Sequence, residues 1–303
     1  MADAPGRADD PFGDIDATTG IWAPHLPPAR VVELPRRGTT LVRECTGGDG
    51  PTFVLLHGLT ATADLNWFSV YDRLSALGSV VALDQRGHGD GIRGRHLSLE
   101  ACADDVAALL DLLELRRAVV VGFSMGGAVA QLTWRRHRSR VEGLVLVATA
   151  ARFPSPTWQR ALWTTMAAAG PVLNRVRPVL DELAVRRAQR GAPPSPRQAW
   201  AQTQLRRNDP LDLLAARRAL ASFDSRSWCG GIDVPSAFVL TERDGVVPPD
   251  RQRELGGAVT GCALEAIDAE HGAFVEAPEL FAPAVERACR SVADRLSSTA
   301  SSS

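Results

Sequence analysis

The stretch AVVVGFSMG occupies residues 118–126, where an apolar run of strand length ends in a G-x-S-x-G pattern. Helical spacing begins directly afterwards, so Ser124 falls on a sharp turn between a strand and a helix. In so tight a turn, Cβ atoms at the two glycine positions would collide with their surroundings. We therefore expect Ser124 to hold a strained backbone that lifts its hydroxyl above the edge of a sheet.

Further apolar runs of strand length lie on both sides of this stretch. They span residues 52–56, 79–83, 143–147, 236–240 and, more weakly, 263–267. Continuous Val and Leu runs are typical of strands covered on both faces, as in a parallel sheet. Segments between them, such as residues 98–113, carry the spacing of amphipathic helices. The sequence therefore predicts an α/β fold with a doubly wound, mostly parallel sheet.

The alternation of strands and helices breaks over residues 152–228, where Ala, Leu, Arg and Gln dominate and prolines interrupt. This segment is too long for an ordinary loop, so we expect a helical cap inserted over the sheet. The core then comprises residues 30–151 and 229–296. Residues 1–29 and 297–303 lack periodicity, and we expect both ends to be flexible.

A serine hydroxyl is a weak nucleophile that needs a base, and the base needs an orienting carboxylate. Asp244 and His271 follow the runs at 236–240 and 263–267, so both are expected at the carboxyl edge of the sheet, beside Ser124. The competing carboxylates are Asp233, Asp250, Asp268 and Glu270. We predict a catalytic triad of Ser124, His271 and Asp244.

Together with His57-Gly58 and the sequence DQRGHG at residues 84–89, these motifs resemble the α/β-hydrolase fold superfamily of esterases and lipases. The resemblance covers roughly residues 31–296. It implies an oxyanion hole formed by the backbone N–H groups of Leu59 and Met125. Two fixed donors of this kind stabilise the negative oxygen of an acyl-transfer intermediate.

The function implied is a serine hydrolase that cleaves a carboxylic ester or related acyl bond through an acyl-enzyme, without a cofactor. Lactonases (including enol-lactonases), thioesterases, carbon–carbon hydrolases and cofactor-free peroxidases of this fold share the triad and stay open as alternatives. A hydrolase-fold protein that binds a ligand without turning it over is the alternative from another class.

The composition of the chain restricts the kinds of molecule that we expect it to bind. The chain has 34 basic and 35 acidic residues and a net charge of −1, without the strong positive field that nucleic-acid binders need. Its five cysteines form no C-x-x-C pair, which favours reduced thiols over a disulfide framework or a metal site. No apolar stretch reaches the length of a membrane span. We expect a cytoplasmic protein with a small-molecule acyl substrate, no nucleic-acid partner and no membrane insertion; its oligomeric state stays open.

Three tryptophans give the predicted cap an apolar side: Trp158, Trp163 and Trp200. Large apolar side chains near an active site either pack the cap onto the sheet or line a pocket for the acyl group. The sequence does not separate these two roles. We carry the three residues forward as candidates for the substrate pocket.

Overall fold

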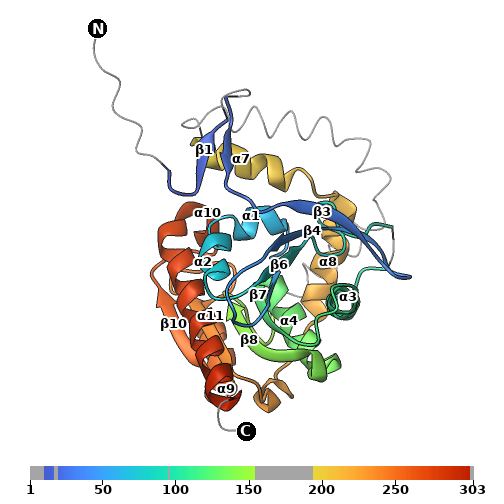
Figure 1. The fold of residues 1–303 in the computed structure, drawn as a ribbon, viewed down its shortest axis with the longest axis vertical. Helices are drawn as coiled ribbons and strands as arrows, with labels where there is room; N and C mark the ends of the chain where they lie inside the picture. Colours follow the sequence, from blue (N-terminus) through green and yellow to red (C-terminus); the bar gives the residue numbers. More distant parts are fainter. Residues whose placement is uncertain (1–9, 17–19, 95, 154–193, 301–303) are drawn as a thin grey trace.

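The computed structural model describes residues 10–16, 20–94, 96–153 and 194–300 (Figure 1). At its centre is an eight-stranded sheet with the order β10-β9-β8-β7-β5-β6-β4-β3. The strands are β3 (Ala29–Leu34), β4 (Gly38–Cys45), β5 (Phe53–Leu56), β6 (Val80–Leu83), β7 (Ala118–Phe123), β8 (Val141–Val147), β9 (Ser236–Thr241) and β10 (Ala263–Ile267). Neighbours from β10 to β6 pair in parallel, whereas β4 pairs antiparallel with β6 and β3. This confirms the predicted mostly parallel sheet.

The central strands are apolar throughout because both of their faces are covered. Along β5, Val54 and Leu56 belong to the hydrophobic cluster on one face of the sheet, whereas Phe53 and Leu55 belong to the cluster on the other. Successive side chains of a strand point to opposite faces, so a strand in this position can carry no polar residue on either face without burying it.

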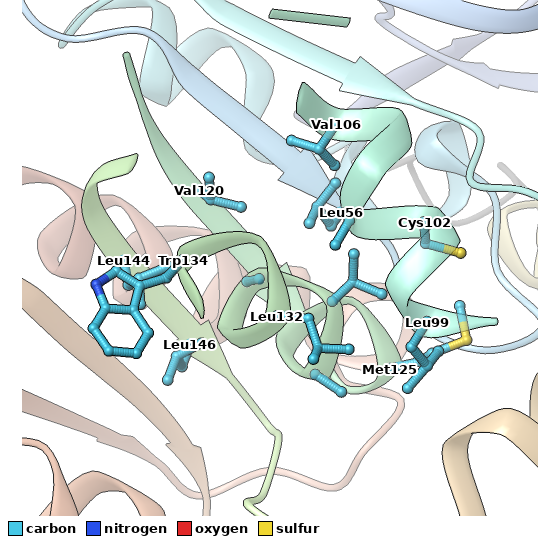
Figure 2. Packing of buried hydrophobic residues seen from close by; sticks show 14 of the residues in the cluster. Leu56, Leu99, Cys102, Val106, Val120, Met125, Leu132, Trp134, Leu144 and Leu146 are labelled. Carbon is cyan, nitrogen blue, oxygen red and sulfur yellow. The ribbon is translucent and has the colours of Figure 1, made fainter. Parts of the chain in front are cut away.

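Helices cover both faces of the sheet, as the doubly wound prediction requires. They are α1 (Ala63–Trp67), α2 (Tyr71–Ser75), α3 (Leu99–Leu112), α4 (Met125–Arg136), α7 (Pro196–Leu205), α8 (Pro210–Ser222), α9 (Pro249–Ala258), α10 (Ala273–Glu276) and α11 (Pro278–Ala300). On one face, Val106 of α3 and Leu132 of α4 share a cluster with Val120 of β7, as Figure 2 shows. On the other face, Phe281 of α11 meets Trp67 of α1, with ring centroids 6.1 Å apart.

The structure describes regular elements within both segments that we expected to be flexible. Within the segment 1–29, which we expected to be flexible, β1 (Gly13–Ile15) and β2 (Trp22–Pro24) form an antiparallel hairpin. Trp22 is only 4% exposed, because its ring packs edge-on against the rings of Phe68 and Trp200. One buried tryptophan among Asp, Pro and Gly gives no periodicity, which is why the sequence did not predict this hairpin. At the other end, α11 continues to Ala300, into the expected flexible tail of residues 297–303.

The predicted cap, residues 152–228, is described only in part. Residues 154–193 lie outside the described residues, and Trp158 and Trp163 lie among them. The described remainder contains α7 and α8. Helix α7 begins with a capping box in which Ser195 accepts the third backbone N–H of the helix, while the glutamine at that position bonds back to the cap. The division of the chain into core and cap stays a prediction.

Two buried histidines, His57 and His88, join the loops that follow β5 and β6. Their rings meet edge to face with centroids 5.2 Å apart, and both residues are 0% exposed. The Nε2 atom of His57 accepts the backbone N–H of Gln85 at 2.8 Å, so the proton lies on Nδ1, which donates to the Gly58 carbonyl at 2.8 Å. Burial disfavours the imidazolium form, and it lowers the pKa of His57 to about 3 and that of His88 to about 4.

Because both histidines are buried in their neutral form, we expect the free energy of unfolding to fall as the pH is lowered below neutrality. The unfolded chain binds protons at histidine below about pH 6.5, whereas the folded pKa values of His57 and His88 are lower, so protonation favours the unfolded state. From pH 7 to pH 5, the loss is roughly 2 kcal/mol for each histidine. Urea unfolding followed by circular dichroism at pH 7 and at pH 5 measures this difference in the free energy of unfolding.

The matched variants are His88→Asn, which removes one titrating ring, and His25→Gln, which replaces an exposed histidine. We expect His88→Asn to be less stable than wild type at pH 7 but to lose less stability on acidification. His25→Gln should follow wild type. Equal pH dependence in His88→Asn and wild type would contradict the assignment.

Candidate active site

Ser124 lies between β7 and α4 in a turn with almost no free space. Its backbone has φ 52° and ψ −113°, a conformation that is strained for a residue with a side chain. A Cβ at Gly122 would lie 2.3 Å from the Gly126 carbonyl oxygen, and a Cβ at Gly126 would lie 2.1 Å from that of Leu56. The two glycines of the motif are therefore required by close backbone contacts, as the sequence predicted.

His271 lies in the loop between β10 and α10, directly beside Ser124. Its Nε2 atom is 3.0 Å from the Ser124 Oγ, and its Nδ1 atom is 2.7 Å from the Oδ2 of Asp244. An ionised carboxylate only accepts hydrogen bonds, so we assign the proton to Nδ1, which leaves the Nε2 lone pair facing the serine hydroxyl. The ring of Phe123 packs on the imidazole, with centroids 4.9 Å apart.

Asp244 sits just past β9 and is 4% exposed. Its Oδ1 accepts the backbone N–H groups of Val246 and Val247, each at 2.8 Å. Burial alone would raise the pKa of the carboxyl, but the hydrogen bond and charge of His271, together with the backbone bonds, hold it below its ordinary value. The carboxylate therefore remains ionised at neutral pH.

Gln252 of α9 also binds the Asp244 carboxylate, and no sequence pattern predicted this contact. The side chain is 0% exposed, and its Nε2 donates to the Asp244 Oδ2 at 3.0 Å. Its Oε1 accepts the backbone N–H of Thr241 at 3.1 Å, and the Thr241 hydroxyl donates to the same carboxylate oxygen at 2.7 Å. A lone glutamine on a short helix forms no motif, so only the tertiary contact identifies it.

The four competing carboxylates are arranged differently from Asp244. All of them lie on the surface: Asp233, Asp250, Asp268 and Glu270 are exposed. Asp268 forms an ion pair with Arg243 at 2.8 Å. Among the carboxylates that the structure describes, Asp244 is the one hydrogen-bonded to His271.

The two amides predicted for an oxyanion hole, those of Leu59 and Met125, are located close to Ser124. A Cβ at Gly58 would lie 3.4 Å from the Ser124 Cβ, so the turn that carries Leu59 passes directly beside the serine. Met125 is the first residue of α4, where a backbone N–H has no acceptor within the helix. Neither amide has a protein acceptor within the described part of the chain. Both are thus available to an anionic oxygen, which the helix N-terminus also favours.

Trp200 is the one predicted pocket residue that the structure describes. It is 7% exposed, and its ring lies 5.4 Å from that of Trp22 and 5.3 Å from that of Phe68. These contacts give it a packing role between α7 and the N-terminal hairpin. A contact between Trp200 and a substrate stays a prediction.

Metal ligands and membrane spans can be assessed only for residues 10–16, 20–94, 96–153 and 194–300. Within these ranges, no three His, Cys, Asp or Glu side chains are grouped so that they could hold a metal ion. Within the same ranges, no helix is both long and apolar enough to cross a membrane.

Sequence comparisons point to esterases. A family model described as the alpha/beta hydrolase fold matches residues 51–278. A pimeloyl-(acyl-carrier protein) methyl ester esterase of Chromobacterium violaceum is 30% identical over 247 residues, which cover 79% of this chain and 94% of that protein. An esterase of the same name from Neisseria meningitidis is 28% identical over 257 residues, covering 75% of this chain and 89% of that protein.

Solved structures agree on the fold. A hydrolase from Pseudomonas aeruginosa superposes with a TM-score of 0.72 at 24% identity, covering 86% of this chain and 98% of that one. An enol-lactonase from Burkholderia xenovorans superposes with a TM-score of 0.67 at 25% identity, covering 86% of this chain and 100% of that one. The chain therefore belongs to the α/β hydrolase fold family, and it is a hydrolase.

Proposed function

We propose that this hydrolase cleaves a carboxylic ester, with Ser124 as nucleophile, His271 as base and Asp244 as the orienting acid. The observation that carries the proposal is the unbroken hydrogen-bonded chain from the Asp244 carboxylate through both ring nitrogens of His271 to the Ser124 hydroxyl. In this arrangement the imidazole can accept the serine proton while the carboxylate stabilises the positive charge that results.

The reaction proceeds in two halves. Ser124 Oγ attacks the ester carbonyl carbon as its proton moves to the Nε2 of His271, and the carbonyl oxygen becomes negative. The N–H groups of Leu59 and Met125 stabilise that oxygen. As the carbon–oxygen bond breaks, His271 returns the proton to the leaving alcohol. Water then attacks the acyl-enzyme by the same route, which releases the acid and restores Ser124.

The names of the relatives support an ester as the substrate class, because the most similar of the curated relatives described above is named for a methyl ester. A lactone is the second candidate. It is an ester closed into a ring, and the structural similarity to an enol-lactonase favours it specifically. Measuring kcat/KM for open-chain methyl esters and for lactones with equal numbers of acyl carbons separates the two. Thioesters and carbon–carbon substrates belong in the same panel.

Replacing Ser124 by alanine should abolish hydrolysis and leave the fold intact, because the substitution removes only the attacking oxygen. We expect kcat to fall by more than about a thousandfold. Labelling with a fluorophosphonate probe, followed by peptide mass spectrometry, should identify Ser124 in wild type. The control is Ser139→Ala, which alters an exposed serine.

The outcome that would contradict the nucleophile assignment is retention by Ser124→Ala of more than about 1% of the wild-type rate. Wild-type protein that binds esters without labelling or turnover would instead favour the ligand-binding alternative.

Replacing Asp244 by asparagine should lower kcat by roughly 10³- to 10⁴-fold with little change in KM. The amide has no charge to stabilise the imidazolium, and its N–H₂ group can hold the ring in the wrong tautomer. Steady-state kinetics on a p-nitrophenyl ester measure the effect, with Asp268→Asn as the matched control at an exposed carboxylate. If Asp268→Asn lost activity while Asp244→Asn kept it, the acid would have to be reassigned.

A further inference from the structure

The turn that carries Leu59 has a strained conformation. It is a four-residue turn over residues 58–61, in which the Ala61 N–H donates to the Gly58 carbonyl at 3.3 Å. Its third residue, Thr60, has φ 69°. A positive φ at that position is typical of a type II turn and is normally supplied by glycine. Because Thr60 is β-branched, surrounding contacts must hold it in this conformation.

Several bonds fix the peptide that contains the Leu59 N–H. In a planar trans peptide, that N–H and the Gly58 carbonyl point in opposite directions. The Gly58 carbonyl accepts from His57 Nδ1 at 2.8 Å, and the Gly58 N–H donates to the Asn66 Oδ1 at 2.8 Å. These bonds hold the first half of the turn, but they do not touch Thr60.

The second half of the turn is held by Asn208, which lies between α7 and α8 and is 4% exposed. Its Nδ2 donates to the Thr60 carbonyl at 2.6 Å and to the Leu205 carbonyl at 3.1 Å. Its Oδ1 accepts the Gly89 N–H at 3.0 Å, from the loop after β6. Both ends of the amide are thus engaged, and their partners fix which end faces Thr60.

From these contacts we propose that Asn208 is a positioning residue for the oxyanion hole. By holding the Thr60 carbonyl, it keeps the strained turn in the shape that directs the Leu59 N–H toward the reacting oxygen. The inference rests on the proposed function, and it adds a requirement: a residue from the predicted cap region is needed for the chemical step itself. The effect should therefore appear in transition-state stabilisation, with little change in substrate binding.

The test combines substitutions at Asn208 and Thr60. Asn208→Asp keeps an oxygen for the Gly89 N–H but, when ionised, has no N–H for Thr60 and faces its carbonyl with a negative oxygen. Adding Thr60→Gly lets the turn adopt the positive φ without that contact. The matched control is Ser222→Ala, because Ser222 is an exposed polar residue at the end of α8 whose hydroxyl donates to the Ala219 carbonyl of the same helix at 2.8 Å.

Two quantities are measured for each variant, per active site as counted by fluorophosphonate labelling. The first is kcat/KM for p-nitrophenyl acetate. The second is Ki for a trifluoromethyl ketone, which forms a tetrahedral adduct with a negative oxygen in the oxyanion hole. For Asn208→Asp we expect kcat to fall at least about tenfold, and Ki to rise by the same factor as kcat/KM falls. Adding Thr60→Gly to Asn208→Asp should restore part of the lost kcat/KM and part of the lost inhibitor affinity, and Ser222→Ala should leave both quantities near wild type.

Asn208→Asp with wild-type kcat/KM per labelled site would overturn the proposal, and so would a loss of kcat/KM at unchanged Ki. If Asn208→Asp gives no soluble protein, the comparison of Asn208→Ala with Asn208→Ala/Thr60→Gly replaces it. Absence of rescue by Thr60→Gly would then count against a positioning role. Failure of the wild-type enzyme to label at Ser124 would overturn the proposed function together with this inference, whereas the other outcomes leave the proposed function standing.

Discussion

The backbone of Ser124 is the constraint on which the rest of the site depends. Its strained conformation persists because β7 lies in the middle of the sheet and α4 is packed on one face of it, so neither end of the turn can relax. The Ser124 N–H bonds to the Val147 carbonyl at 2.9 Å, and its own carbonyl accepts the Thr149 hydroxyl at 2.8 Å. Once the turn is held, the hydroxyl and the first amide of α4 are both located at the carboxyl edge of the sheet.

The ionisation of Asp244 also depends on its position at the carboxyl edge of the sheet. Asp244 is buried, which would favour its protonated form, but the hydrogen bond and charge of His271, together with the other donors around it, keep the carboxylate ionised. Gln252 supplies one of these donors without adding a charge. An arginine in its place would pair with the carboxylate and compete with His271 for it. In the proposed mechanism, a neutral amide therefore holds the acid in position and leaves its negative charge for the imidazolium.

The sequence predicted the elements whose cause is local. The apolar runs of the central strands reflect burial on both faces, and the glycines around Ser124 reflect backbone contacts within one turn. His271 and Asp244 could be proposed because parallel strands end at one edge. Gln252 and Asn208 could not, because each is a single neutral amide whose role depends on partners brought together by folding. The N-terminal hairpin was missed for the same reason, since the rings that pack edge-on against Trp22 come from residues distant in the sequence.

The contacts around Asn208 also change how the predicted cap relates to the core. The adjacent Arg207 donates to Asp90 at 2.6 Å and to the buried Asp84 at 3.3 Å. These ion pairs attach the turn between α7 and α8 to the loop after β6. Asn208, in the same turn, donates a hydrogen bond to the Thr60 carbonyl, and such a bond weakens steeply as its length increases or its angle bends. A ligand that shifted this turn by about an ångström would break the bond while the triad stayed assembled. Under the proposed mechanism, the active site would then keep its triad without a complete oxyanion hole.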